Sequence, residues 1–351
     1  MFGLTPLKFK LPAFLAPALL LLGSAGAAAQ GNSQNANGQP FEALQQQINA
    51  LQSQIDTLNA GIDQGPIEID VDCNAGDTIG GAIASVGDAP NPLIITVSGT
   101  CPGVVLFRSD VTLRGQSPSD GISGGYAVLA SRGANHITVE SMTLTGSAAG
   151  LACFNGASVA ASNVSIINSN TGVQAFNGGS CFVSDSVIDG SNSGVSVSTS
   201  SSAWLRGVDV TNSVTGANVF TNGALYLTAS PSNGSFSTIS GSSVMGMQIF
   251  ANGSVWLNRA IIENNNLGIS VLAGSSLFTG GGDIALIQNN AGTGVRIQGL
   301  GNTIISDGVS ITGNGGWGLQ CLGTSWASLN GSPDISGNSD GDIFPDCGVG
   351  P

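Results

Sequence analysis

The chain has 351 residues, of which 53 are glycine and only 8% are charged. With 41% hydrophobic residues and a mean hydropathy of +0.27, it is too apolar for a disordered chain. Glycine without a strict three-residue period excludes collagen. The formal net charge is −13, and both lysines, Lys8 and Lys10, lie near the N-terminus. Because nucleic acids bind clustered Lys and Arg, this composition argues against a nucleic-acid partner and instead indicates a repetitive β protein.

Residues 1–29 have the order of a secretory signal peptide. The two lysines precede an apolar run at residues 11–22, and a small-residue stretch at 24–29 ends before Gln30. We expect cleavage after Ala29, because the run is shorter than the roughly 20 residues that a membrane span needs. The mature protein is therefore predicted to be exported to the periplasm, the cell surface or the extracellular space, with no integral membrane segment.

A polar linker (residues 30–40) precedes a predicted coiled-coil oligomerisation helix (residues 41–64). Apolar residues recur there at alternating spacings of three and four, a narrow heptad seam. Isoleucine at a with leucine at d nominally favours two strands, although dimer and trimer both stay open. The alternative is an amphipathic helix lying on the end of the protein's own domain. The seam residues are Phe41, Leu44, Ile48, Leu51, Ile55, Leu58 and Ile62.

All six cysteines follow the signal peptide, which fits an oxidising compartment. No C-x-x-C motif or histidine-rich segment accompanies them, so they are interpreted as structural disulfides and not as zinc ligands. Six cysteines allow 15 pairings, and the preferred one joins neighbours in sequence. These pairs are Cys73–Cys101, Cys153–Cys181 and Cys321–Cys347.

Residues 65–115 are predicted to form an N-terminal cap with the first strands, and residues 116–351 to form repeats with a C-terminal cap. A glycine before an apolar residue recurs, mostly at 22-residue intervals, and three short alternating stretches follow each glycine. Such stretches cannot bury themselves singly, so we predict an all-β, single-stranded parallel solenoid with three parallel sheets and about 22 residues per rung. The glycines are Gly150, Gly172, Gly194, Gly216, Gly246, Gly268, Gly294 and Gly318.

The repeats resemble the right-handed parallel β-helix (pectin-lyase-like) family over residues 66–347. The resemblance rests on stacked x-G-[VI]-x-[VI] units, on the cap-like segment 76–101, on the early rung 111–115 and on asparagines before turns. It implies a fold but leaves the function open, because this fold serves lyases, hydrolases, esterases, tailspikes, adhesins and structural proteins. The asparagines are Asn168, Asn170, Asn192, Asn212, Asn264 and Asn314.

One candidate catalytic set follows from this resemblance. Pectate-lyase-like members use calcium held by stacked aspartates, with an arginine or lysine as base. Counting by rungs places four residues on the outward side of one sheet, about 4.8 Å apart per rung: Asp185, Asp189, Arg206 and Asp209. The alternative is that the acids cover a solvated face and pair loosely with Arg206. Calcium is expected only if the protein is a lyase; otherwise no metal or cofactor is predicted.

Two further candidates are weaker. The single histidine, His136, is predicted to be a solvated turn residue. A serine hydrolase using it stays open, although the chain has no G-x-S-x-G elbow and no G-H-G motif of the polygalacturonase-like members. Arg259 with Glu263 is the other weak pair.

Outward-facing aromatic residues are the most regular feature. The tenth residue after the anchoring glycine is aromatic in five consecutive rungs, which makes a column about 19 Å long. Three interpretations remain open: a groove on which sugar rings stack, a face buried against another subunit, or a brace of the sheet. The column consists of Phe182, Trp204, Tyr226, Trp256 and Phe278.

The sequence therefore predicts an exported, disulfide-bonded parallel β-helix that forms homo-oligomers. Its expected role is non-catalytic, as a polysaccharide-binding or envelope and surface interaction protein. The alternative is a polysaccharide lyase or related carbohydrate-active enzyme of the pectin-lyase-like type. A second alternative is a structural adhesin or stalk.

Overall fold

The computed structural model describes residues 39–62, 65–280, 284–347 and 349–350. The predicted signal peptide and most of the predicted linker lie outside the described residues. The chain divides into two compact units, Met1–Gln64 and Gly65–Pro351. In the first unit the described residues form one helix, α2 (Gln39–Ile62), which matches the helix predicted for residues 41–64.

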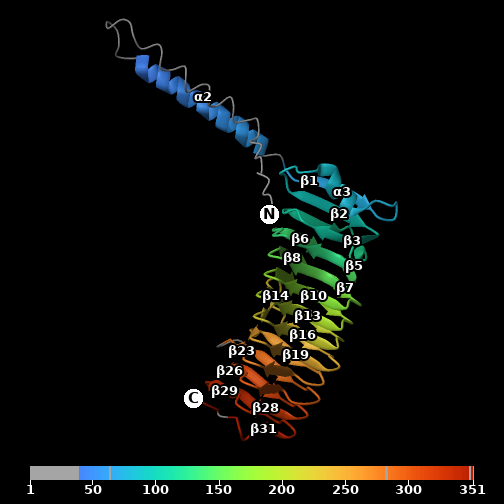
Figure 1. Ribbon diagram of the computed structural model, residues 1–351, viewed down its shortest axis with the longest axis vertical. Coiled ribbons are helices and arrows are strands. Elements are labelled where there is room, and N and C mark those ends of the chain that lie inside the picture. Colours follow the sequence, from blue (N-terminus) through green and yellow to red (C-terminus); the bar gives the residue numbers. More distant parts are fainter. Residues whose placement is uncertain (1–38, 63–64, 281–283, 348, 351) are drawn as a thin grey trace, which may run out of the picture. The chain divides into compact units, whose positions relative to one another are not determined.

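The second unit is a parallel β-solenoid of about 12 turns (Figure 1). Its turns average about 23 residues, one more than predicted. The reason is that some turns carry inserts: Val195 pairs with Ala217, 22 residues on, whereas Ala217 pairs with Met247, 30 residues on. Every turn in the regular part adds one strand to each of three faces, here called A, B and C.

Face A is a sheet of 13 strands among the described residues. In spatial order these are β1 (Ile67–Asp72), β2 (Leu93–Ser98), β4 (Val111–Gly115), β6 (Ile137–Glu140), β8 (Ser158–Ser162), β11 (Ser180–Ser184), β14 (Ser202–Arg206), β17 (Ala224–Thr228), β20 (Ser254–Leu257), β23 (Ser276–Thr279), β26 (Asn302–Ser306), β29 (Trp326–Asn330) and β32 (Val349–Gly350).

Faces B and C belong to one hydrogen-bonded sheet of 19 described strands. Face B contains β9 (Ser165–Ile167), β12 (Val187–Asp189), β15 (Asp209–Thr211), β18 (Ser237–Ser240), β21 (Ala260–Glu263), β24 (Ala285–Gln288), β27 (Val309–Thr312) and β30 (Asp334–Ser336). Face C contains β10 (Thr171–Phe176), β13 (Ser193–Ser198), β16 (Thr215–Phe220), β19 (Met245–Phe250), β22 (Ile269–Leu272), β25 (Val295–Gln298), β28 (Trp317–Leu322) and β31 (Gly341–Ile343).

The two faces join in the first turns, through β3 (Thr100–Leu106), β5 (Gly121–Ala130) and β7 (Thr143–Phe154). Strand β7 pairs with β9 at its start and with β10 at its end. Gly146 lies between these two parts, and a Cβ there would collide with the carbonyl oxygen of Ala149. The prediction of three separate sheets is therefore corrected to three faces of two sheets, because the long strands bend around a corner without breaking.

A single hydrophobic core runs through the solenoid. Inward residues of successive strands lie in register, so aliphatic side chains stack from turn to turn. On face C one such column consists of Val173, Val195, Ala217, Met247 and Ile269, each fully buried. Alternation of inward and outward residues was the feature that predicted these strands, and the burial confirms it.

The first turn is closed by the short helix α3 (Ile79–Val86). The Thr78 hydroxyl oxygen accepts a hydrogen bond of 3.0 Å from the Gly81 backbone N–H, which caps the helix. Ile79 and Ala82 are buried, and Ile83 packs against the core. The helix thus shields the apolar end of the stack from water.

Three disulfides join neighbouring turns near the start, in the middle and at the end of the solenoid. Their Cα–Cα distances are 5.1, 5.8 and 4.9 Å, which are ordinary values. The bonded pairs are the predicted ones: Cys73–Cys101, Cys153–Cys181 and Cys321–Cys347.

Buried polar side chains fill the corner between faces B and C. Serine occupies it in four turns and asparagine in the next four. Each of the first three asparagine amides bonds to the amide of the following turn, and that of Asn338 bonds to the Asp342 carboxylate. We call these hydrogen-bonded asparagines the asparagine ladder. Of the asparagines expected before turns, only Asn314 belongs to it. Asn168, Asn212 and Asn264 each lie one residue before a corner residue and have positive φ angles. The corner residues are Ser169, Ser191, Ser213, Ser242, Asn265, Asn290, Asn314 and Asn338.

Candidate functional site: the aromatic column of face A

The five predicted aromatic residues lie in register on the outward side of face A. Each pairs with the next through its strand: Phe182 with Trp204, Trp204 with Tyr226, Tyr226 with Trp256, and Trp256 with Phe278. Their inward neighbours are core residues; Cys181 and Val183 on either side of Phe182, for example, are buried. The period of two along each strand is thus what sends all five rings to the surface.

Three of the four neighbouring pairs in the column have stacked rings. The ring centroids of Trp204 and Tyr226 are 4.0 Å apart at an interplanar angle of 15°. Phe182 and Trp204 lie 6.3 Å apart, and Trp256 and Phe278 lie 5.6 Å apart, both also stacked. Phe182 is 40% exposed and Trp256 44% exposed, even though stacking covers part of each ring. The column is therefore an open apolar surface.

Small hydroxyl side chains flank the column on both sides. On one side Ser158, Ser180 and Ser202 lie in register, and the hydroxyl oxygens of Ser180 and Ser202 are 3.0 Å apart. On the other side, Ser162 and Ser184 precede Arg206 in the same register. The aromatic strip thus lies in a polar frame that is almost free of charge.

A second set of outward aromatic residues lies on face C. Phe220 and Phe250 stack at 4.9 Å with an interplanar angle of 6°, while Phe154 and Phe176 contact edge to face at 5.7 Å. These pairs are separated by Ser198, which aligns with Phe176. Face C therefore carries short, separate aromatic groups, whereas face A has five aromatic residues in consecutive turns.

Two of the four predicted catalytic residues, Asp185 and Asp209, line one depression, and Asp189 and Arg206 are not among its lining residues. Asp185 accepts hydrogen bonds from the hydroxyls of Ser230 and Ser232, the latter at 3.0 Å, both in the insert after β17. Asp209 and Asp185 line a shallow depression of ≈ 340 Å³ beneath that insert. No ion pair found among the described residues includes Arg206, so the loose pairing offered as an alternative is not present either.

Asp189 is held by hydrogen bonds on face B. Its Oδ1 accepts one from the Thr211 hydroxyl and one from the Asn212 amide, each at 2.7 Å. Both bonds lower the pKa of Asp189 below its ordinary value, and the bond from Thr211 has the larger effect. A lowered pKa makes a carboxylate a weak base, so Asp189 is poorly suited to removing a proton.

The fold of pectate-lyase-like enzymes implies calcium, and the four predicted residues do not fit it as placed. Calcium takes six to eight oxygen ligands, whereas Oδ1 of Asp185 and Oδ1 of Asp189 each already accept two hydrogen bonds. Within the described ranges, no three His, Cys, Asp or Glu side chains lie close enough to hold one metal ion.

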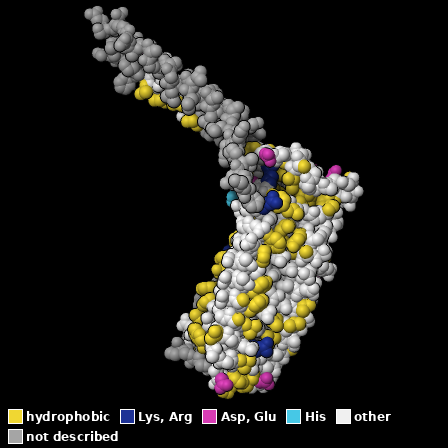
Figure 2. Space-filling model, in the orientation of Figure 1, with side chains coloured by type: hydrophobic (Ala, Val, Ile, Leu, Met, Phe, Trp, Pro, Cys, Tyr) yellow, Lys and Arg dark blue, Asp and Glu magenta, His cyan; other side chains and the backbone are white. Residues whose placement is uncertain are grey.

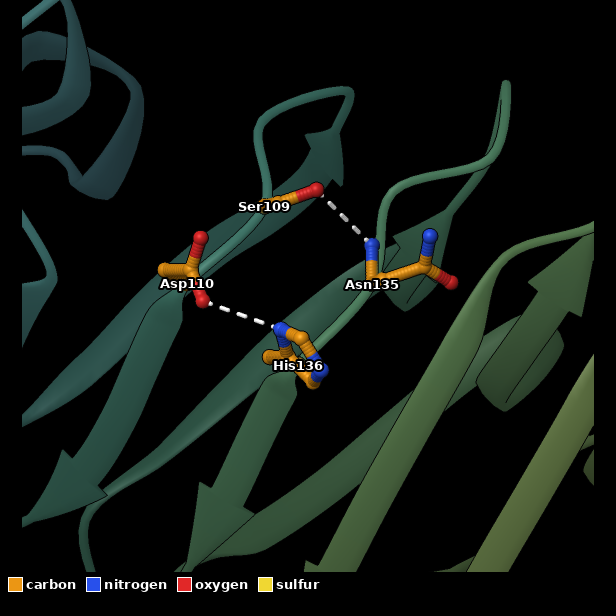
Figure 3. A network of polar contacts seen from close by, with 4 residues as sticks. All are labelled: Ser109, Asp110, Asn135 and His136. Atoms are coloured by element: carbon orange, nitrogen blue, oxygen red, sulfur yellow. Dashed lines mark hydrogen bonds and ion pairs between the residues drawn. The ribbon is translucent and has the colours of Figure 1, made fainter. Parts of the chain in front are cut away.

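His136 is a solvated turn residue, as predicted. It has a positive φ of 55° and a side chain that is 82% exposed, and its Nδ1 lies 3.1 Å from Asp110 Oδ1 (Figure 3). The Ser109 hydroxyl oxygen accepts a hydrogen bond of 3.0 Å from the Asn135 backbone N–H and faces away from the imidazole. The His136–Asp110 pair is thus not hydrogen-bonded to Ser109, and this serine is not arranged as a nucleophile.

In the other weak pair, Glu263 accepts a hydrogen bond of 2.8 Å from Gln288. No helix in the described part of the chain is long and apolar enough to cross a membrane.

No protein-family model matches the sequence, and no curated protein matches it. Among solved structures, the alginate lyase from Paenibacillus sp. is similar to this chain with a TM-score of 0.51 at 13% identity, over 81% of this chain and 97% of its own. This similarity shows the fold alone. The fold is a right-handed parallel β-helix. The A-modules of the mannuronan C-5 epimerases AlgE4 and AlgE6 from Azotobacter vinelandii have TM-scores of 0.48 and 0.45 at 15% identity, over 77% and 75% of this chain and 93% of each module.

Sequence reasoning located the insert after β17 but missed its contact with Asp185. Ser230 and Ser232 are 45 and 47 residues away from that aspartate along the chain. The longer spacing between Gly216 and Gly246 marks an insert, but no pattern in the sequence indicates which way it folds. Only the placement of adjacent turns brings the serines to the carboxylate.

Proposed function

We propose that this protein is an exported, non-catalytic β-helix protein that binds polysaccharide along the aromatic column of face A. The column itself is the observation that carries the proposal. Contiguous exposed apolar strips on soluble proteins usually mark binding surfaces, and the exposed parts of the aromatic rings offer apolar contact to the C–H groups of a sugar ring. The stacked ring centroids lie only 4.0–6.3 Å apart, so an oligosaccharide along or across the strip contacts some of the rings and not all.

The test replaces Trp204 or Trp256 with alanine and measures affinity for a panel of polysaccharides by affinity electrophoresis and calorimetry. By analogy with bases stacked on aromatic rings, each loss weakens binding by about 1–3 kcal/mol, which is roughly 5- to 150-fold. Phe250→Ala is the matched control, because Phe250 is also a stacked, outward aromatic residue but lies on face C. Equal affinity of all variants would refute the proposal.

The same variants separate the other two interpretations of the column. If the column is a subunit face, Trp204→Ala and Trp256→Ala lower the mass measured by light scattering. If it only braces the sheet, they lower the melting temperature and leave mass and binding unchanged. If the wild type binds no polysaccharide and the variants leave the mass unchanged, the rigid stalk or adhesin is supported instead.

A polysaccharide lyase is the second candidate function. It is favoured by the shared fold with the Paenibacillus alginate lyase and by the depression that Asp185 and Asp209 line. We favour binding over this chemistry because two of the three predicted acids, Asp185 and Asp189, accept hydrogen bonds through Oδ1. Incubation with pectate, alginate and other uronates, with and without calcium, decides between them: ultraviolet absorbance from unsaturated products, absent in Asp209→Asn, supports the lyase.

We further propose that helix α2 joins copies of this chain as a coiled coil. Four of its seam residues are about half exposed: Leu44, Ile48, Leu51 and Ile55, at 48–58%. The two charged residues of the helix, Glu42 and Asp56, lie at b positions, so no like charges oppose one another across a seam between copies. Light scattering on the mature protein tests this: Ile48→Asp with Leu51→Asp lowers the mass, whereas Gln46→Asp, at an f position, does not. A monomeric wild type would refute it.

Export rests on the N-terminal pattern together with the three disulfides, which persist in oxidising compartments. Expression with the native N-terminus, followed by N-terminal sequencing of the exported protein, should give Gln30 as the first residue. Retention of residues 1–29 would contradict this.

A further inference from the structure

We infer that the polysaccharide bound by face A is a neutral one; this inference rests on the proposed function. The decisive observation is the distribution of charge. The six strands that carry and border the column, β8, β11, β14, β17, β20 and β23, contain no Asp or Glu, and their single charged residue is Arg206. The whole chain, by contrast, has 21 acidic residues and a net charge of −13.

The acidic residues that the structure describes in the same turns lie on face B or at its edge. Asp189, Asp209 and Glu263 belong to strands β12, β15 and β21, across a corner from the column. Asp185, at the end of β11, is covered by the hydroxyls of the insert after β17. On the side of the solenoid shown in Figure 2, the described charged side chains gather near the two ends, and hydrophobic and uncharged polar side chains cover the middle.

The frame of the column has the chemistry of a sugar partner. A serine hydroxyl both donates and accepts hydrogen bonds, as a sugar hydroxyl does. Ser180 and Ser184 lie on either side of Phe182 in β11, and Ser202 lies beside Trp204 in β14. Aromatic rings contribute apolar contact at low entropic cost. Neither group needs a charge on the ligand.

A polyuronate lacks a matching surface here. It carries one carboxylate per sugar, and binding such a polymer requires a row of cations or bridging metal ions. Arg206 supplies one guanidinium, at one turn of the column, and the protein's net negative charge opposes approach of a polyanion. The geometry therefore favours a neutral glycan over the anionic polymers on which the Paenibacillus lyase acts.

The experiment compares polymers that share a backbone and differ in charge. Hydroxyethyl cellulose and carboxymethyl cellulose form one pair, and neutral glucan, xylan and mannan are set against polygalacturonate and alginate. We expect neutral polymers to bind at least about tenfold more tightly, with little change between low and high salt. Trp256→Ala should remove this binding, while Phe250→Ala leaves it unchanged.

The outcomes separate this inference from the function on which it rests. Tighter binding of polyuronates, lost in Trp256→Ala and weakened by salt, would overturn the neutral ligand and keep the aromatic column as the binding site. Equal affinity for the neutral and the anionic polymer of each pair would also overturn the inference that the ligand is neutral. If no polymer binds, or if binding ignores Trp256, the proposed function fails and the inference fails with it.

Discussion

The buried asparagine ladder predicts a large loss of stability from a single substitution, Asn290→Ala. Asn290 is 1% exposed. Its Nδ2 donates to Ile262 O at 3.1 Å and to Asn314 Oδ1 at 2.9 Å, and its Oδ1 accepts from the backbone and side-chain N–H groups of Asn265, both at 3.1 Å. Alanine removes all four bonds and leaves their partners without water. At about 1 kcal/mol per bond, the free energy of unfolding falls by roughly 3–5 kcal/mol.

Urea unfolding followed by circular dichroism measures this loss. Asn302→Ala serves as the control, since Asn302 lies half-buried on the outward side of β26, and its change should stay within about 0.5 kcal/mol. Asn290→Ser should lose less than Asn290→Ala, because serine fills the same corner in the turns at Ser213 and Ser242. A loss under about 1 kcal/mol for Asn290→Ala, with an unchanged urea slope, would show that the ladder does not hold the turns together.

Two further predictions concern the disulfides and the response to acid. Replacing Cys153 and Cys181 together with serine should reduce the free energy of unfolding by about 2–4 kcal/mol, and a melting temperature equal to wild type would contradict this. The folded-state pKa of Asp189 lies below its ordinary 3.8, because Thr211 and Asn212 donate to its carboxylate. The hydrogen bonds from Thr211 and Asn212 therefore contribute their full stabilisation when the pH is above the ordinary pKa of 3.8, and this stabilisation is lost as the pH falls through the folded-state pKa. Asp189→Asn should then lose less stability than wild type on acidification from about pH 5 to about pH 2; parallel losses would show that the carboxylate does not contribute.

The sequence by itself determined the local alternation and its period. Inward and outward positions such as Cys181 and Phe182 follow from the two-residue period of a strand, and the repeat aligns them from turn to turn. That alignment was enough to predict the aromatic column. The order of the cysteines gave only a preference for pairing neighbours, and the structure confirms it, because residues 26 or 28 apart lie about one turn apart in such a coil.

Only the tertiary structure decided which residues at the corners point inward. Asn264 and Asn265 are adjacent in the sequence, yet the positive φ of Asn264, 56°, turns the chain so that Asn265 enters the core. Likewise, the insert after β17 could have covered any neighbouring surface, and its serines reach Asp185 through contacts between turns. The physical reason is common to both cases. Side-chain direction in a strand is fixed by its period, but in a turn or an insert it depends on backbone angles that the surrounding packing selects.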